Sequence, residues 1–175
     1  MRLVPVVLFY FGDSGRVQEY AIQSSRTTHG TAEVLDCCRL FARLLEFALQ
    51  GGNVREAFPL KGLPLHTPKV MALANGEWRA KRLDEIRGSG YCVESLEAAL
   101  WCFNQTTTLR DALLAAANLG DDADTTAAIV GQLAGAYYGV QAIPKHWLGC
   151  LHMGEEIAAI ARSLHTVAKG RQMQP

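Results

Sequence analysis

Apolar residues recur at intervals of three and four positions along most of the chain, whereas the strict alternation of a half-buried strand is almost absent. The spacing is clearest over residues 31–50, where one helix face would carry Leu35, Cys38, Phe41, Leu45 and Ala48. Two glycines follow at positions 51 and 52, as expected where a helix ends in a left-handed cap. The pattern predicts an all-α fold.

Start and stop signals mark several further helices. Thr67 followed by Pro68 is typical of a helix start, Asn53 and Glu56 have the spacing of a capping box, and Thr108 can cap a helix that follows it. A glycine-rich turn at 87–91 precedes an amphipathic segment. Besides these, the sequence predicts helices over 17–25, 109–118, 124–138 and 153–168, and a frayed tail over 170–175.

Three carboxylates stand where the most apolar, small-residue helix is expected to begin, in "NLGDDADTTAAIVGQLAGAYYG", residues 118–139. Burying ionised carboxylates costs several kcal/mol unless a partner offsets the loss of water. Asp122, Asp124 and Thr125 offer oxygen atoms at positions i, i+2 and i+3. Two interpretations remain open: the aspartates are caps at the positive end of the helix dipole, or they bind a hard cation such as Mg²⁺ or Ca²⁺.

The same helix carries small residues at Gly131, Ala134 and Gly135. Small side chains let two helix backbones approach closely. We therefore expect this side of the helix to meet a neighbouring helix.

Composition narrows the class of partner. The chain has 175 residues, enough for one sizeable core, and Lys plus Arg balance Asp plus Glu at 17 each. Without a basic stripe, nucleic-acid binding is not expected. No apolar run reaches the roughly 20 residues that span a bilayer, so no membrane segment is expected either. An apolar fraction of 49% with 19% charged residues suggests that some apolar surface meets another protein.

The first residues, "MRLVPVVLFYF", imitate a signal peptide, but Pro5 interrupts the run and no small-residue cleavage pattern follows. The five cysteines are odd in number and show no CxxC spacing. They indicate reduced thiols in a cytoplasmic protein. Cys37 and Cys38 have no His near them in sequence, so a nucleophilic thiol is not predicted there.

The stretch at 118–139 closely resembles the C-terminal signature of the ADP-ribosylglycohydrolase family. Five other segments resemble that family in the same order: "MRLVPVVLFY", "SSRTTHG", "CRLFARLL", "RGSGYCVESLEAALWCF" and "IPKHW". The resemblance implies a compact orthogonal helical bundle around two Mg²⁺ or Mn²⁺ ions. Such a protein would bind ADP-ribose, or an ADP-ribosylated protein, and cleave the glycosidic bond to the side chain.

Matched position by position, the resemblance implies metal ligands at Asp122, Asp124 and Thr125. It implies ligand-binding roles for His29 of "TTHG" and Tyr91 of "GSGY". Each of these two has an ordinary alternative, because His29 can cap a helix end and Tyr91 can be a core aromatic residue.

Family members also carry, ahead of the part matched here, an acidic residue tied to catalysis, a Thr-Asp-Asp trio and a glycine-rich loop. This chain has no counterpart of these, so no catalytic residue is assigned. We expect residues 1–169 to be the C-terminal portion of an N-terminally truncated family domain. Partners would be a separate N-terminal half, or a second copy meeting exposed apolar faces. The alternative function is a non-catalytic ADP-ribose-binding or scaffold protein.

Overall fold

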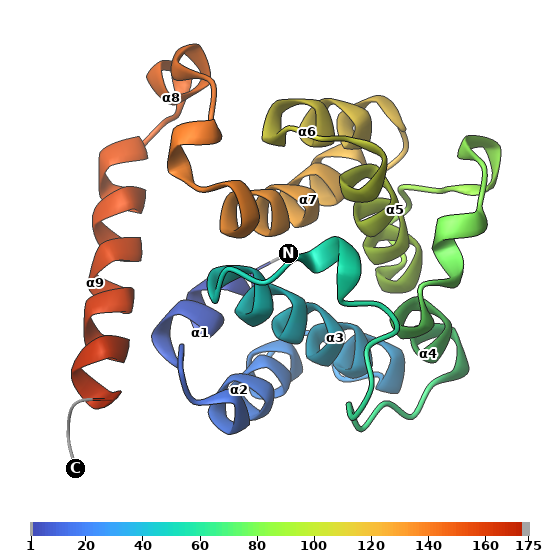
Figure 1. The fold of residues 1–175 in the computed structure, drawn as a ribbon, viewed down its shortest axis with the longest axis horizontal. Helices are drawn as coiled ribbons and strands as arrows, with labels where there is room; N and C mark the ends of the chain where they lie inside the picture. Colours follow the sequence, from blue (N-terminus) through green and yellow to red (C-terminus); the bar gives the residue numbers. More distant parts are fainter. Residues whose placement is uncertain (1, 173–175) are drawn as a thin grey trace.

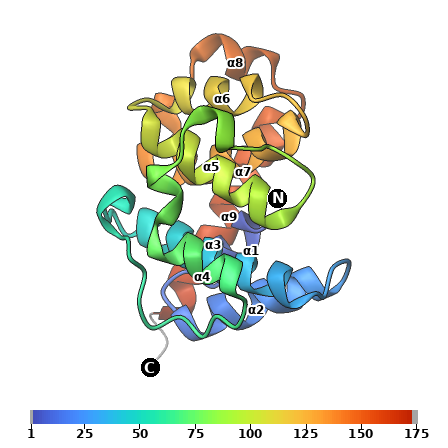
Figure 2. The ribbon, with the colours of Figure 1, turned by 90° about the vertical axis from the view of Figure 1, so that its right-hand side faces the viewer.

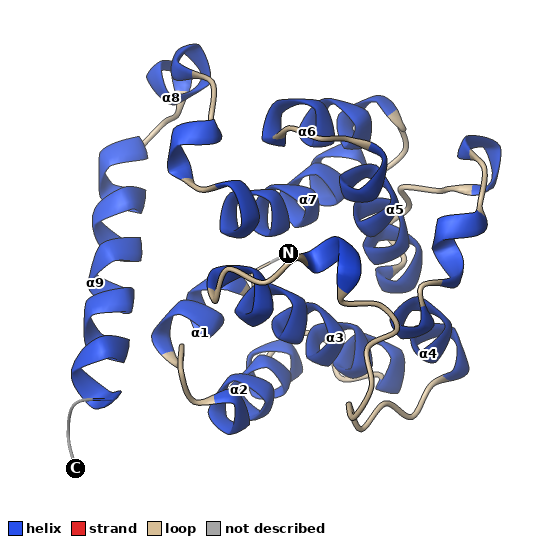
Figure 3. Cartoon of the chain, in the orientation of Figure 1, coloured by secondary structure: helices blue, strands red, loops and turns tan. Residues whose placement is uncertain are grey.

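The computed structural model describes residues 2–172, and all regular structure within this range is helical (Figure 3). This confirms the predicted all-α fold. The α-helices, in chain order, are α1 (Val4–Phe9), α2 (Ser14–Arg26), α3 (Ala32–Leu49), α4 (Pro68–Asn75), α5 (Cys92–Gln105), α6 (Leu109–Asn118), α7 (Ala123–Tyr138), α8 (Lys145–Cys150) and α9 (Gly154–Gln172).

Helix α3 lies at the centre of the molecule, where it packs against α1, α2, α4, α5 and α7 (Figure 1). In the view turned by 90°, α4 again lies beside α3 (Figure 2). Helices α5, α6 and α7 pack on one another on one side of α3, and α1 and α2 pack on its other side. Helix α9 packs on α1 at the margin and runs across the direction of α3 (Figure 1).

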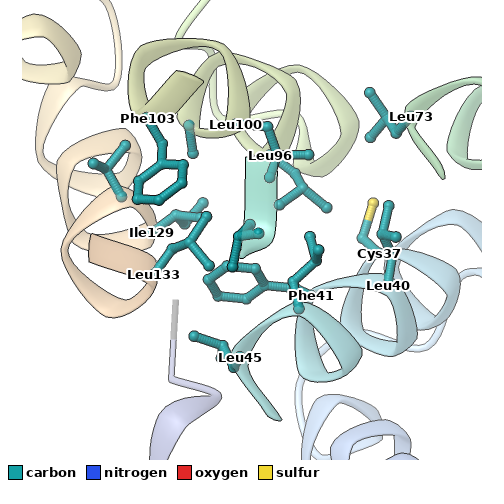
Figure 4. Close-up of a cluster of buried hydrophobic side chains, with 14 of the residues drawn as sticks. Cys37, Leu40, Phe41, Leu45, Leu73, Leu96, Leu100, Phe103, Ile129 and Leu133 are labelled. Atoms are coloured by element: carbon teal, nitrogen blue, oxygen red, sulfur yellow. The ribbon is translucent and has the colours of Figure 1, made fainter. Parts of the chain in front are cut away.

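The core forms where α3, α5 and α7 meet. Phe41 and Leu45 of α3 contact this region from one side, and Figure 4 shows side chains of α5 and α7 closing it from the other, among them Leu96, Leu100, Phe103, Ile129 and Leu133. The predicted face of α3 is only partly right, because Leu35 and Cys38 are half-buried, whereas Leu40 and Leu44 outside that face are fully buried. Helices pack on several sides of α3, so its buried surface is wider than one amphipathic stripe.

Two short helices were not predicted. The first eleven residues contain α1, whose Val7 is fully buried and whose Pro5 lies in the first turn, where a missing backbone N–H costs no hydrogen bond. The other short helix, α8, follows Pro144. Within residues 2–172, no helix is both long enough and apolar enough to traverse a bilayer.

Other boundaries agree with the sequence to within a few residues. Helix α2 begins earlier than predicted because the Asp13 carboxylate caps it, accepting from the Arg16 backbone N–H at 3.0 Å. Helix α9 continues to Gln172, so the first part of the expected tail is helical, while 173–175 lie outside the described residues. A side chain at Gly131 would contact Leu113, whereas one at Gly135 would meet nothing within 4 Å. Close helix packing therefore explains the first glycine and not the second.

Candidate functional site

A cavity of about 720 Å³ opens between α2, α3, the start of α5 and the start of α7. Its wall brings together four of the residues singled out from the sequence, His29, Tyr91, Asp122 and Thr125, which come from three separate segments. Asp124 does not line this cavity and is exposed. The fold thus places most of the predicted site around one space large enough for a small-molecule ligand.

The start of α7 presents its carboxylates without internal partners. Asp122 occupies the N-cap position, but its side chain accepts no capping hydrogen bond. Its backbone carbonyl accepts from the Thr126 N–H, as in any helix, and from the Thr126 hydroxyl, each at 3.1 Å. Within residues 2–172, the side chains of Asp122, Asp124 and Thr125 have no hydrogen-bond or ion-pair partner. The structure therefore contains no side-chain cap at Asp122, and these oxygens are free to meet a ligand.

The glycine-rich loop at 87–91 lies directly against the start of α7. The Asp122 backbone N–H donates to the Gly88 carbonyl at 2.8 Å, and a Cβ at Gly88 would lie 3.0 Å from the Thr126 hydroxyl oxygen. A Cβ at Gly90 would lie 3.4 Å from the Asp122 Oδ2 atom. Glycine at these two positions permits the close approach that brings Tyr91 and Asp122 to one cavity.

Tyr91 is held by two charged side chains that the sequence analysis missed. Its hydroxyl donates to Glu33 Oε2 at 2.6 Å and accepts from Lys69 Nζ at 3.1 Å, while Lys69 and Glu33 approach to 3.9 Å. The hydrogen bond to Glu33 is the main cause of a raised Tyr91 pKa, followed by loss of solvent. The bond to Tyr91 in turn raises the pKa of Lys69. Glu33 lines the cavity, yet an acidic residue in a first helical turn is too common to be singled out.

His29 lies at the rim, just beyond the end of α2. Its backbone N–H donates to the Ser25 carbonyl at 2.8 Å, and the Ser25 hydroxyl donates back to the His29 carbonyl at 3.0 Å. The exposed imidazole approaches the Thr28 hydroxyl at 2.9 Å. Arg2, also on the cavity wall, donates to the same hydroxyl at 3.0 Å. The backbone of His29 thus continues the hydrogen bonding at the end of α2, while the residue itself is exposed and forms part of the cavity wall.

The donors at α7 suit part of a hard cation's coordination shell. Residues 2–172 hold no group of three or more His, Cys, Asp or Glu side chains placed to bind a metal ion. Asp122, Asp124 and Thr125 supply two carboxylates and a hydroxyl, the ligand type that Mg²⁺ prefers, but Mg²⁺ takes about six oxygens. The residues present thus fit such an ion incompletely, leaving coordination positions for water, ligand or other groups.

A family model and several known proteins match this chain over most of its length. The family model described as ADP-ribosylglycohydrolase matches residues 1–173. The protein called ADP-ribosylarginine hydrolase Tri1 from Pseudomonas putida is 38% identical over 164 residues, which are 94% of this chain and 44% of the relative. A protein of the same name from Serratia proteamaculans is 38% identical over 168 residues, 96% of this chain and 46% of the relative.

A more distant relative is the ADP-ribosyl-[dinitrogen reductase] glycohydrolase of Rhodospirillum rubrum, 28% identical over 89% of this chain and 50% of the relative. A solved structure titled "ADP-ribosylglycohydrolase-related protein complex" superposes with a TM-score of 0.86 at 39% identity, covering 95% of this chain and 58% of that one. The chain spans about half the length of the curated relatives it matches.

Proposed function

The chain belongs to the ADP-ribosylglycohydrolase family, and we propose that it forms part of a metal-dependent hydrolase that removes ADP-ribose from modified protein side chains. The observation that carries the proposal is the cavity on which His29, Tyr91, Asp122 and Thr125 converge. The relatives named as ADP-ribosyl hydrolases support the reaction class. Residues 1–169 would be the C-terminal portion of the family's domain.

In this proposal Asp122, Asp124 and Thr125 would hold Mg²⁺ or Mn²⁺. The bound ion would supply Lewis-acid chemistry at the oxygens of the ribose. Two ions are expected in a complete family site, and one or none held by this chain alone.

The other cavity residues would bind and orient the ligand. The Tyr91 ring would pack against the sugar. Glu33 and Lys69 hold its hydroxyl, so the ring would keep one orientation in the cavity wall. His29, an exposed residue of the cavity wall, would contact the ligand from its solvent side. The Arg2 guanidinium would attract the diphosphate, as arginine does in charge-assisted pairs.

We propose that the remaining metal ligands and the catalytic acid come from outside these 175 residues. They would lie on the same or a separate polypeptide carrying the N-terminal half of the site. A second copy is another proposed partner, through the α8–α9 apolar surface, defined as the exposed residues Leu148, Leu151, Met153, Ile157, Ile160 and Val167. A cytoplasmic location remains a prediction.

A second candidate function is a non-catalytic ADP-ribose-binding or scaffold protein. The incomplete donor set at the start of α7 favours it, because a cavity can retain affinity without the groups that break a bond. An assay for ADP-ribose release from an ADP-ribosylated protein, run with the N-terminal half of the site present, separates the two functions.

The first test is calorimetric titration of ADP-ribose into the chain with Mg²⁺ and with EDTA. We expect heat of binding that requires Mg²⁺ and an affinity about tenfold weaker or worse in Asp122→Asn, roughly 1.4 kcal/mol or more. The fold should persist, because the Asp122 side chain makes no hydrogen bond or ion pair that the substitution would break. Asp13→Asn is a matched control, since Asp13 caps α2 away from this cavity.

Two results would contradict the proposal. Binding that is equal in EDTA and unaffected by Asp122→Asn would remove the metal role of Asp122. No binding by wild-type protein with a native helical circular-dichroism spectrum would show that the cavity does not take ADP-ribose without further groups.

A further inference from the structure

Three cysteines line the cavity, and neither the proposed chemistry nor the family resemblance gives them a role. Cys37 and Cys38 lie on α3, and Cys92 is the first residue of α5. All three are free thiols. Cys37 is buried among the labelled core side chains (Figure 4), while Cys92 is half-buried on the cavity wall. The packing of α3 against α5 brings Cys37 and Cys92, from distant parts of the sequence, to the wall of the same cavity.

The thiols of Cys37 and Cys92 interact with each other, and their environments differ. This interaction is the main cause of a raised pKa at Cys37, with burial second. The same interaction is the main cause of a lowered pKa at Cys92. Burial and Glu33 oppose the lowering, while the backbone N–H groups of Val93 and Cys92 at the start of α5 assist it. Cys92 is therefore the better thiolate, as expected at a helix N-terminus, and Cys37 is its thiol donor.

We propose that Cys92 and Cys37 are a redox-sensitive pair on the cavity wall, which a hydroperoxide converts into a reversible disulfide between α5 and α3. Three features support the pair: both thiols line the same cavity, the helices that carry them pack on each other, and the more exposed thiol lies at the start of a helix. The bond would tie α3, which carries Glu33, to the residue next to Tyr91.

With hydrogen peroxide as oxidant the reaction has two steps. The Cys92 thiolate attacks one peroxide oxygen, so an S–O bond forms, the O–O bond breaks, and hydroxide leaves and takes a proton to become water. The Cys37 sulfur then attacks the Cys92 sulfenic acid. The S–S bond forms, the S–O bond breaks, and the Cys37 proton leaves with the hydroxyl as a second water. The two sulfurs are oxidised and the peroxide is reduced.

The other cysteines provide internal controls. Cys38 also lines the cavity, but burial raises its pKa. Cys102 is fully buried away from the cavity, and burial raises its pKa to about 12. Cys150 is exposed on α8. Oxidation of the exposed Cys150 would give disulfides between molecules, whereas the buried Cys102 and the less reactive Cys38 would give none.

The test treats the whole chain with hydrogen peroxide, isolates the monomer, blocks remaining thiols and locates links by peptide mass spectrometry. We expect a loss of two hydrogens and a cross-link between the peptides of Cys37 and Cys92, both reversed by dithiothreitol. Cys38→Ser and Cys150→Ser should keep the link, whereas Cys37→Ser and Cys92→Ser should lose it. Cys38→Ser also assigns the link to Cys37, since the two neighbours share one tryptic peptide.

The proposal is overturned if folded wild type forms no such link, if the link survives in Cys37→Ser or Cys92→Ser, or if Cys92 is oxidised further without it. Should a serine variant fail to fold, the cross-linked peptides of wild type and Cys38→Ser still decide the result. The readout is covalent mass, so the outcome does not depend on whether the cavity binds ADP-ribose.

Discussion

At the scale of single residues, Tyr91 shows how the cavity is prepared for a ligand. Its hydroxyl donates to the Glu33 carboxylate and accepts from the Lys69 ammonium group. These two hydrogen bonds fix the orientation of the hydroxyl group. The ion pair between Lys69 and Glu33 contributes little to stability, since water screens it. Their role is to fix the direction of a side chain on the wall, which reduces the conformational freedom lost when a ligand binds.

This arrangement predicts a specific pH response. Tyr91 keeps its proton above the ordinary pKa of 10.0, chiefly because of the bond to Glu33. Its contribution to folding is therefore complete below the unfolded pKa and is lost as the pH rises through the higher folded one. In Glu33→Gln the negative charge is gone, and we expect the phenol of Tyr91 to titrate at lower pH.

The measurement is an alkaline absorbance titration, with Tyr91→Phe subtracted so that the other tyrosines cancel. Glu97→Gln is the matched control, because Glu97 pairs with Lys81. A Tyr91 titration unchanged in Glu33→Gln, or equally shifted in Glu97→Gln, would contradict the role of Glu33.

A place on the cavity wall was predictable where a local motif marks a residue. His29, Tyr91, Asp122 and Thr125 each lie in a short distinctive segment, and the fold brings them to one cavity. The places of Glu33 and Arg2 on the wall, and the meeting of Cys37 and Cys92 at one cavity, depend on packing between distant segments. No local pattern encodes such contacts.

At the scale of elements, the loop at 87–91 and the start of α7 form one unit. The backbone of the loop accepts the Asp122 N–H, which would otherwise be an unpaired helix-start donor. The glycines let this backbone lie against Thr126 and Asp122. The geometry of the aspartates thus depends on the loop as well as on α7.

Gly88→Ala tests this dependence. A Cβ there would lie 3.0 Å from the Thr126 hydroxyl oxygen, so the loop must shift, and we expect a stability loss of about 1–3 kcal/mol, typical of overpacking. Gly135→Ala in α7 is the control: its Cβ would meet nothing within 4 Å, and alanine should stabilise the helix by about 0.5–1 kcal/mol. Urea denaturation measures both. Equal effects of the two substitutions would show that the loop yields without cost.

The sequence analysis missed the two shortest α-helices and underestimated the buried surface of the long ones. Helices α1 and α8 have 6 residues each, too few for a repeat of apolar positions to be recognised. Long helices such as α3 were found, but the extent of their buried surface was not. That extent depends on how many neighbours pack on a helix, which its own sequence does not specify.

At the scale of the whole molecule, α9 is much less integrated than the helices around α3. It packs on α1, and Ala168 is its only buried residue within the part of the chain described. Ile157 and Ile160 lie on its surface with 51% and 60% of their area exposed. A helix with so little burial gains little stability from tertiary packing.

We expect hydrogen exchange to reveal this difference. In a dilute sample the amides of α9 should exchange through local opening, well before those of α3, α5 and α7, which open only with the core. If the α8–α9 apolar surface meets a second copy, the exchange of α9 should slow as protein concentration rises, while that of α3 stays constant. Mass-spectrometric exchange at two concentrations measures both effects.

Ile160→Ser separates the protection that α9 gains from packing on α1 from the protection that it would gain from a second copy. Because Ile160 is exposed in the single chain, the substitution should leave α9 exchange unchanged in the dilute sample and abolish its slowing in the concentrated one. Exchange that does not depend on concentration in wild type would remove the second copy as a partner for this surface. Protection of α9 equal to that of α3 in the dilute sample would instead show that α1 alone holds it firmly.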